Sequence, residues 1–310
     1  MFECIQVSIE LYILGSSSAT PTKDRHPSAQ VLKIGGEKIL IDCGEGTQTQ
    51  LMKYGIKHAN INTICISHLH GDHYFGLIGL LSTMSLYGRS QAIRIIGPPM
   101  LKDIIDIQLK ASSMQLNFDL EHIVTKMDEH NVVYQTPVFT IKTFPLQHRI
   151  HCTGFIVSEA EKERHINKTA IDTYQIPVAA FKDLKAGLAY TNEQGQTIAN
   201  HLLTTAPEMP CAYAYCSDTI FDLNIVESIK GCHTLYHEAT YTSEHVDRAN
   251  LYHHSTAEQA ATIALKAEVK QLIIGHYSSR YGHVDPLHNE AKAVFEPVEL
   301  AIEGKTYTIG

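Results

Sequence analysis

The stretch Ser67-His68-Leu69-His70-Gly71-Asp72-His73 places three imidazoles and one carboxylate within a few residues. A regular helix or strand does not aim all four groups in one direction, because the first two histidines share a strand face that the aspartate and the last histidine do not. An irregular loop that bends at the glycine does. The strand-like run Asn62–Ile66 directly precedes the stretch, and open α/β folds place their sites at the carboxyl ends of strands. The stretch therefore predicts a metal-binding loop after a buried strand.

Three other apolar runs, interpreted as strands, also end on histidine or aspartate, at His148, Asp218 and His276. A single residue of either type is more often solvated or part of a core. The dense cluster at His68–His73, together with three further residues of these types at strand ends, favours metal ligands instead. Nitrogen and oxygen donors of these types suit Zn²⁺ or another borderline divalent ion, and the set exceeds what one tetrahedral site uses. The sequence predicts two metal ions, with ligands His68, His70, Asp72, His73, His148, Asp218 and His276.

Length and composition describe an ordinary globular chain. The 310 residues suit either one α/β domain with an insertion or two domains. With 44% hydrophobic and 19% charged residues, disordered and fibrous classes are excluded. The formal net charge is −8, so any nucleic-acid partner must be bound by a local basic patch. Histidine is abundant, with 19 copies, and is the commonest metal ligand among side chains.

The cysteines and the N-terminal residues bear on the compartment. Seven cysteines, an odd number without a CxxC pair, do not form the pattern of a secreted disulfide framework. Met1–Gln6 carries an acidic residue where a signal peptide needs a basic one, and no apolar stretch approaches the ~20 residues of a membrane span. We expect a cytoplasmic protein with no membrane association.

Strand-like and helix-like patterns alternate along the chain and indicate an α/β fold. Residues 7–13 alternate with the period of a half-buried strand, and Gly35-Gly36 separates two short apolar runs as in a hairpin. Residues 75–87, 99–112 and 256–269 are predicted helices. Residues 158–210 are polar and irregular, and too long for an ordinary connection. They form either a functional arm or a tolerated surface insertion.

The ligand pattern resembles the metallo-β-lactamase superfamily. Its signature is the HxHxDH arrangement at His68–His73, and the three strand-end ligands follow in the superfamily's order across the whole chain. The resemblance implies a single αββα four-layer sandwich domain over residues 1–310, with the arm at 158–210 inserted in it. It also implies that His68, His70 and His148 bind one zinc ion, that Asp72, His73 and His276 bind the other, and that Asp218 bridges the two.

Five ordered motifs resemble the ribonuclease Z branch of that superfamily. Two of them differ from the family pattern, since His26 replaces an asparagine and Ile78 stands where proline is common. The arm also differs, because it contains no Gly-Pro element and is not basic overall. The motifs are the first loop Gly15–His26, the extended metal loop Ser67–Leu81, His237-Glu238-Ala239-Thr240, His254-Ser255-Thr256, and His276-Tyr277-Ser278-Ser279-Arg280-Tyr281.

Catalytic roles follow partly from chemistry and partly from the resemblance. Cleavage of a phosphodiester expels an alkoxide, which a positioned imidazole can protonate when a carboxylate orients it. His254 and Glu238 could form that pair, although Ser255 or Thr256 is also the expected N-cap of the next helix. The resemblance implies that Asp72, besides binding metal, accepts a proton from the attacking water.

A basic and hydroxyl-rich set is expected to bind the substrate. The guanidinium of Arg280 matches phosphate oxygens bidentately, which favours a phosphodiester substrate; alternatively, Arg280 forms a structural salt bridge. Lys23 and Arg25 contact phosphates or are ordinary solvated charges. The predicted substrate-binding residues are Lys23, Arg25, Ser278, Arg280 and Tyr281.

The resemblance implies a zinc-dependent endoribonuclease, with Mn²⁺ as another possible ion. It would remove the 3′ trailer of precursor tRNA by metal-hydroxide attack, leaving a 3′-hydroxyl on the tRNA and a 5′-phosphate on the trailer. A homodimer is expected. One alternative is a metallo-β-lactamase-fold phosphodiesterase acting on small or cyclic nucleotides. Another is a metal-bound nucleic-acid-binding protein without turnover, against which the presence of Asp72, Glu238 and His254 argues.

Overall fold

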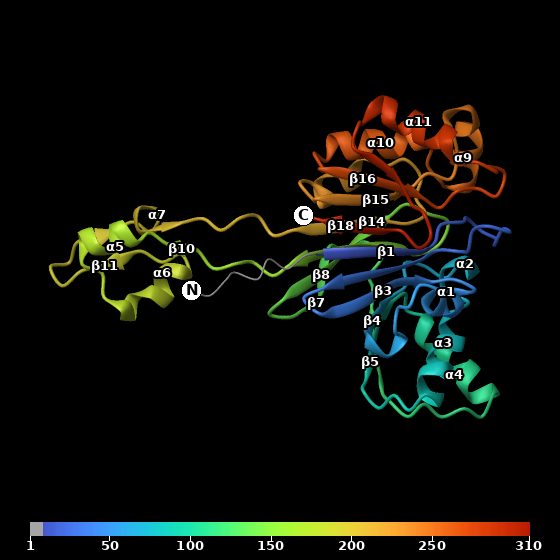
Figure 1. The fold of residues 1–310 in the computed structure, drawn as a ribbon, viewed down its shortest axis with the longest axis horizontal. Coiled ribbons are helices and arrows are strands. Elements are labelled where there is room, and N and C mark those ends of the chain that lie inside the picture. Colours follow the sequence, from blue (N-terminus) through green and yellow to red (C-terminus); the bar gives the residue numbers. More distant parts are fainter. Residues whose placement is uncertain (1–8) are drawn as a thin grey trace. The chain divides into compact units, whose positions relative to one another are not determined.

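The computed structural model describes residues 9–310, so Val7, Cys4 and the segment Met1–Gln6 lie outside the described residues. The chain divides into two compact units (Figure 1). The larger one contains residues 9–159 and 211–310, and the smaller one is Ala160–Pro210.

The first sheet of the larger unit has seven strands, in the order β18-β1-β2-β3-β4-β5-β6. The pairs from β3 to β6 are parallel, and those from β18 to β3 are antiparallel. Gly35 and Gly36 form the expected hairpin turn, both with positive φ. The strands are β1 (Ile9–Gly15), β2 (Ala29–Ile34), β3 (Glu37–Cys43), β4 (Ile61–Cys65), β5 (Ile93–Gly97), β6 (Leu120–Val124) and β18 (Thr306–Ile309).

The second sheet also has seven strands, in the order β17-β16-β15-β14-β9-β8-β7. The pairs from β14 to β17 are parallel, whereas β7, β8, β9 and β14 pair antiparallel. The strands are β7 (Asn131–Gln135), β8 (Phe139–Leu146), β9 (Cys152–Glu159), β14 (Ala212–Cys216), β15 (Thr234–Glu238), β16 (Gln271–Gly275) and β17 (Val298–Leu300).

Helices cover the outer face of each sheet (Figure 1). The first sheet carries α1 (Thr47–Lys53), η1 (His58–Asn60), α2 (Gly71–Tyr74), α3 (Leu77–Leu86) and α4 (Leu101–Ala111). The helices that follow β14 in the chain are η3 (Leu223–Ile225), α8 (Val226–Ile229), η4 (Ser243–His245), α9 (Val246–Tyr252), α10 (Ala257–Lys266) and α11 (Asp285–Val294).

Three apolar clusters hold these layers together. Strand residues such as Leu32 and Phe155 pack between the two sheets. Leu81 of α3 belongs to the cluster under the first sheet, and Ala264 of α10 to the cluster over the second. Alternate residues of a strand point to opposite faces, so each sheet contributes to an inner and an outer cluster. The expected four-layer αββα sandwich is confirmed.

Local details refine the expectations from sequence. The helix predicted from Pro99 begins at Leu101, because Pro98 and Pro99 form the turn that leads into it. Thr256 is the N-cap of α10 and forms a capping box with Gln259. Within residues 9–310, no helix is long and apolar enough to cross a lipid bilayer.

The smaller unit, Ala160–Pro210, is more ordered than its polar sequence suggests. Its own apolar cluster contains Ile176, Leu184, Ile198 and Leu203, which are widely spaced in the chain. It contains five basic and six acidic residues. Its elements are β10 (His165–Ile166), α5 (Lys168–Tyr174), η2 (Val178–Ala180), α6 (Phe181–Lys185), β11 (Tyr190–Thr191), β12 (Thr197–Ile198), α7 (Asn200–Leu203) and β13 (Thr204–Thr205).

The contact between the sheets predicts a large effect for one core truncation. Phe155 of β9 is fully buried between the sheets, so Phe155→Ala should lower the free energy of unfolding by about 3–5 kcal/mol. Leu86→Ala is the matched control, because Leu86 is 82% exposed, and should change it by less than about 0.5 kcal/mol. Urea unfolding measures both. A loss below about 1 kcal/mol for Phe155→Ala would contradict its place between the sheets.

Candidate metal centre

The carboxyl ends of several strands meet at one edge of the larger unit and carry the predicted ligands. Within each sheet the neighbouring parallel strands end at the same edge. The loop with His68, His70, Asp72 and His73 begins two residues after β4, and the strands β8, β14 and β16 are followed by His148, Asp218 and His276. Four separate segments thus converge, as the strand-end pattern predicts.

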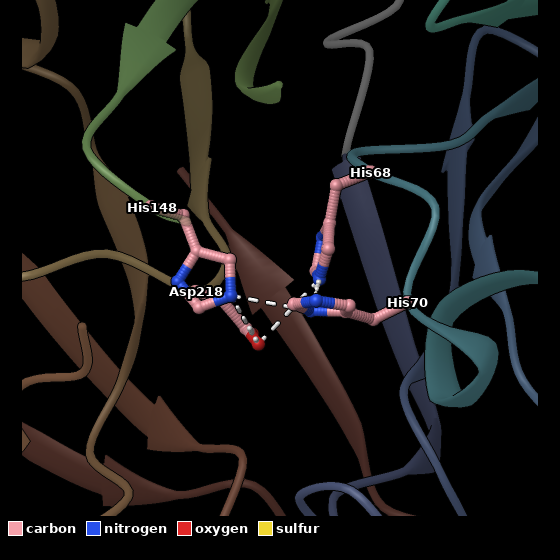
Figure 2. Close-up of side chains that lie close together, drawn as sticks. All are labelled: His68, His70, His148 and Asp218. Carbon is pink, nitrogen blue, oxygen red and sulfur yellow. Dashed lines mark hydrogen bonds and ion pairs between the residues drawn. The ribbon is translucent and has the colours of Figure 1, made fainter. Parts of the chain in front are cut away.

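Three imidazoles and one carboxylate form the first donor cluster (Figure 2). Nδ1 of His70 lies 3.1 Å from Nε2 of His68 and 3.2 Å from Nε2 of His148. Oδ2 of Asp218 lies 3.6 Å from Nε2 of His68 and 3.8 Å from Nε2 of His148. The four donor atoms lie within 4.8 Å of one another, so one cation can contact them all.

The second donor cluster contains Asp72, His73 and His276. Oδ2 of Asp72 lies 3.4 Å from Nε2 of His73 and 3.5 Å from Nε2 of His276. Oδ1 of Asp218 lies 3.4 Å and 3.1 Å from the same two nitrogens. Asp218 therefore directs one oxygen to each cluster, which is the geometry that a bridging carboxylate requires.

Outer hydrogen bonds determine which imidazole nitrogens face the centre. Nδ1 of His148 donates to the backbone carbonyl of His253, at 2.9 Å, and Nδ1 of His73 donates to the carboxylate of Asp42, at 2.7 Å. A carbonyl or carboxylate oxygen only accepts, so each Nδ1 carries a proton and each Nε2 is the nitrogen that faces the donor cluster. Nδ1 of His276 lies 2.9 Å from Oγ1 of Thr240. Such partners orient ligands and set their tautomer.

Asp42 was missed by the sequence interpretation, although it follows the apolar residues of β3 as the ligands follow theirs. It is fully buried. Besides His73, its carboxylate accepts hydrogen bonds from the backbone and hydroxyl of Ser67 and from the hydroxyl of Tyr215. Its φ of 55° is strained for a residue with a side chain, as are the values at His253 and His276. Three of the positive-φ residues thus shape the centre, and others, such as Ser113 and Glu268, lie elsewhere in the larger unit.

The donor set fits divalent cations. Nε2 of His73 and Nε2 of His276 are buried and have no hydrogen-bond partner among the described residues, and buried polar atoms are normally satisfied. Two imidazole nitrogens of one tetrahedral zinc ion are about 3.3 Å apart, given Zn–N bonds of about 2.0–2.1 Å. The nitrogen separations around His70 match that value. The residues therefore suit divalent metal binding.

The pKa shifts of the donor residues also favour cation binding. Burial lowers the pKa of His68 well below its usual value, so its lone pair is not occupied by a proton. Burial opposes ionisation of Asp218, yet the surrounding imidazoles hold the pKa of Asp218 well below its ordinary range. Burial alone would lower the pKa of His73, but the charges of the nearby carboxylates outweigh burial and hold this pKa well above its usual value. The raised pKa favours a second proton on the His73 ring, at Nε2, and a cation in the centre would take the place of that proton.

Glu238 and His254 form a buried pair beside the centre. Nδ1 of His254 lies 2.8 Å from Oε1 of Glu238, and that oxygen also accepts from the backbone of Thr219. Thr240 donates its hydroxyl to Oε2 of Glu238. Burial disfavours the charged imidazole, but the charge and hydrogen bond of Glu238 outweigh it and raise the pKa of His254 to about 9. Donor atoms of His254, His276 and Asp218 also lie within 4.8 Å of one another.

The predicted substrate-binding residues lie around the same edge but differ in their contacts. Lys23 is exposed, and Nη2 of Arg25 donates to the backbone carbonyl of Tyr281 at 2.7 Å. The hydroxyl of Tyr281 bonds to Thr242. Arg280 is exposed and lies 5.4 Å from the ring centroid of Tyr241. The backbone of Ser278 donates to Thr240, a neighbour of Glu238.

A cavity of about 460 Å³ opens onto the centre. His70, Asp72, Asp218 and His254 line it together with Ser18–Pro21 of the first loop. The backbone of Ala19 donates to Oδ2 of Asp72, at 2.8 Å. The first loop, members of both donor clusters and His254 thus border one space. Phe75 and Arg149, which the sequence interpretation did not single out, also line it.

Known proteins of one family resemble this chain over nearly its whole length. A protein named Ribonuclease Z from Bacteroides fragilis strain YCH46 is 43% identical over 294 residues, covering 95% of this chain and 97% of the relative. A Ribonuclease Z from Cytophaga hutchinsonii is 43% identical over 304 residues, covering 98% and 97%. Residues 9–177 also match the family described as Anti-Pycsar protein Apyc1, a range that ends before Asp218.

Solved structures agree with the sequence relatives. The short form of human tRNase Z is 29% identical, with a TM-score of 0.71, and the likeness covers 97% of this chain and 99% of the human one. The metallo-β-lactamase fold protein YhfI from Bacillus subtilis, at 17% identity and a TM-score of 0.69 over 98% and 100% of the two chains, shares the fold. The chain belongs to the ribonuclease Z family of hydrolytic endoribonucleases, built on the metallo-β-lactamase fold.

Proposed function

We propose that this chain is an endoribonuclease that removes the 3′ trailer of precursor tRNA, and that it uses two zinc ions. The observation that carries the proposal is the shared carboxylate of Asp218, with one oxygen toward each donor cluster, in a cavity that also contains His254. The family membership supports an RNA substrate, and the human relative is named as a tRNase.

His68, His70 and His148 would hold one cation, Asp72, His73 and His276 the other, and Asp218 both. When bound, such a pair lowers the pKa of water and neutralises charge on both the attacking and leaving oxygens of an in-line displacement. Mn²⁺ suits the same donors less well than zinc does, because imidazole nitrogen dominates the set.

Side chains around the centre accept and donate the protons that the reaction transfers. A water oxygen attacks phosphorus, Asp72 accepts the proton that this water loses, and the bond from phosphorus to the 3′ oxygen breaks. His254, protonated and oriented by Glu238, gives its proton to the departing 3′ oxygen. The products are a tRNA with a 3′-hydroxyl and a trailer with a 5′-phosphate. The buried position of Glu238 keeps the imidazole in one orientation.

Substrate binding is assigned to two regions. Lys23, Arg280 and Ser278 would contact the RNA near the cleaved bond, while Arg25 and Tyr281 also join the first loop to the final motif through the Arg25–Tyr281 hydrogen bond. The smaller unit, Ala160–Pro210, would bind the body of the tRNA. A homodimer in the cytoplasm is part of the same proposal.

The first prediction concerns metal content. Purified protein should bind two divalent ions per chain, measured by elemental analysis after loading and desalting. Asp218→Ala should reduce the affinity for both ions more than removal of one imidazole does, because this carboxylate faces both clusters. His148→Ala is the matched comparison, since His148 reaches one cluster. A fully loaded stoichiometry of one ion would refute the two-ion site.

The second prediction concerns the general acid. His254→Ala should lower kcat on RNA by about 10²-fold or more, and the loss should shrink for bis(p-nitrophenyl) phosphate, whose leaving group needs no proton. The acid form exists below the pKa of His254, about 9, so cleavage should fall as pH rises through that value. Glu238→Gln removes the charge that raises this pKa, and the alkaline fall should move to lower pH.

Two controls accompany this measurement. Metal content must be equal in the compared proteins, because His254 lies near Asp218 and His276. Equal losses on both substrates, at equal metal content, would exclude His254 as the proton donor to the leaving oxygen.

The third prediction tests the substrate and the arm together. Wild-type protein should cut a labelled precursor tRNA and leave the ends stated above, as mapped by gel electrophoresis. Replacing Ala160–Pro210 with a short Gly/Ser linker should raise KM for precursor tRNA but leave hydrolysis of bis(p-nitrophenyl) phosphate near wild type, since distant contacts contribute affinity that a small diester cannot use. The linker is feasible because Glu159 and Cys211 are hydrogen-bonded neighbours.

The arm variant must first be shown to be folded and loaded with metal. Since the arm has no net positive charge, only part of the salt dependence of RNA binding should disappear. Unchanged kinetics on precursor tRNA would reject the role of the arm and favour a small or cyclic nucleotide as substrate.

A further inference from the structure

Phe75 is an exposed aromatic residue in the wall of the catalytic cavity. Its residue surface is 63% exposed, although it directly follows the short helix α2 that contains Asp72 and His73. It lines the same cavity as His70, Asp72 and His254. An exposed phenylalanine beside catalytic groups is not explained by core packing.

The position of this ring is supported by Gly71. A Cβ atom added at Gly71 would lie 2.2 Å, 2.5 Å and 2.7 Å from Cε2, Cζ and Cδ2 of Phe75. The ring therefore packs directly against the backbone of the metal loop, and the backbone of Phe75 donates to the carbonyl of Gly71. The ring of Tyr74 lies 5.1 Å away, edge to face. The side chain is supported on one side while the residue remains mostly exposed.

Arg149 is the cationic residue in the same wall. It is exposed, directly follows the donor His148, and lines the cavity with Phe75. Among the described residues it has no hydrogen-bond or ion-pair partner, in contrast to Arg25, which bonds to Tyr281. The cavity lining also contains the carboxylates of Glu45, Asp72 and Asp218.

We propose that Phe75 and Arg149 form a subsite for one nucleotide next to the cleaved bond, with its base stacked on Phe75 and its phosphate bound by Arg149. The inference rests on the proposed ribonuclease function. Base–aromatic stacking tolerates any base, because every base has a π face. The subsite would therefore position the strand without reading its sequence.

The decisive experiment combines protein and substrate changes. Phe75→Ala, Phe75→Leu and Phe75→Trp are compared on precursor tRNA and on two versions with an abasic nucleotide, one on the 5′ side of the cleaved bond and one on the 3′ side. Tyr87→Ala is the matched control, because Tyr87 is 79% exposed and does not line the cavity. Metal content is measured for each variant, since Phe75 is close to His73 in sequence.

Phe75→Ala and Phe75→Leu should lower kcat/KM on precursor tRNA by about 5- to 150-fold, the range found for loss of one base–aromatic stack. Phe75→Trp should stay near wild type, and so should Tyr87→Ala. On one of the two abasic substrates, Phe75→Ala and wild type should become equal, and the side on which this occurs identifies the stacked nucleotide.

A second measurement addresses the phosphate. Arg149→Ala should reduce the slope of log KM against log salt by about 0.7, the value for one phosphate contact on a single strand. Arg149→Lys should retain most of that slope.

The outcomes separate this subsite from the function on which it rests. If wild type does not cut precursor tRNA, the proposed function fails and the subsite fails with it. If wild type cuts normally but neither abasic substrate is slower, or Phe75→Leu equals Phe75→Trp, the stacking subsite alone is overturned. An unchanged salt slope in Arg149→Ala overturns the phosphate contact.

Discussion

The buried carboxylate of Asp42 is the interaction on which the centre depends. It lies at the end of β3 and accepts hydrogen bonds from Ser67 in the metal loop, from Nδ1 of His73, and from the hydroxyl of Tyr215 in the second sheet. One side chain thus joins both sheets to the loop that supplies most of the donors. A buried carboxylate that lacks hydrogen-bond donors costs free energy, because water cannot reach it to replace them. The donors to Asp42 are therefore held in one arrangement.

The second constraint is charge. Asp42, Asp218 and Glu238 are buried at this edge, with Asp72 partly buried beside them. Imidazoles lie among these carboxylates, and Nε2 of His73 and Nε2 of His276 have no hydrogen-bond partner among the described residues. Isolated charges in such surroundings are strongly unfavourable. Divalent cations would neutralise the carboxylates and satisfy the nitrogens together, so metal binding and stability of this edge of the fold are expected to be coupled.

Under the proposed function, chemistry and substrate recognition are divided along the chain. The strands and their carboxyl ends hold reacting groups rigidly, as Glu238 does for His254. The first loop and the wall with Phe75 and Arg149 are more exposed and offer surfaces for a flexible strand. The unit Ala160–Pro210 has an apolar cluster of its own. Its lack of net positive charge indicates that any grip on RNA relies on shape and a few local contacts more than on a general basic surface.

The sequence alone determined the alternation of strands and helices and the strand-end positions of the histidine and aspartate donors, because hydrophobic period, loop composition and the HxHxDH spacing are local properties of the chain. The four-layer sandwich was expected from the family resemblance of the motifs. The sequence also determined the N-cap region of α10, where Thr256 and Gln259 are close in sequence. Only the tertiary structure decided that Asp42 orients His73, which oxygen of Asp218 faces which cluster, that Arg25 contacts Tyr281, and that Phe75 faces the cavity. These facts join residues from distant segments, and no local pattern specifies which side chains meet when two sheets pack face to face.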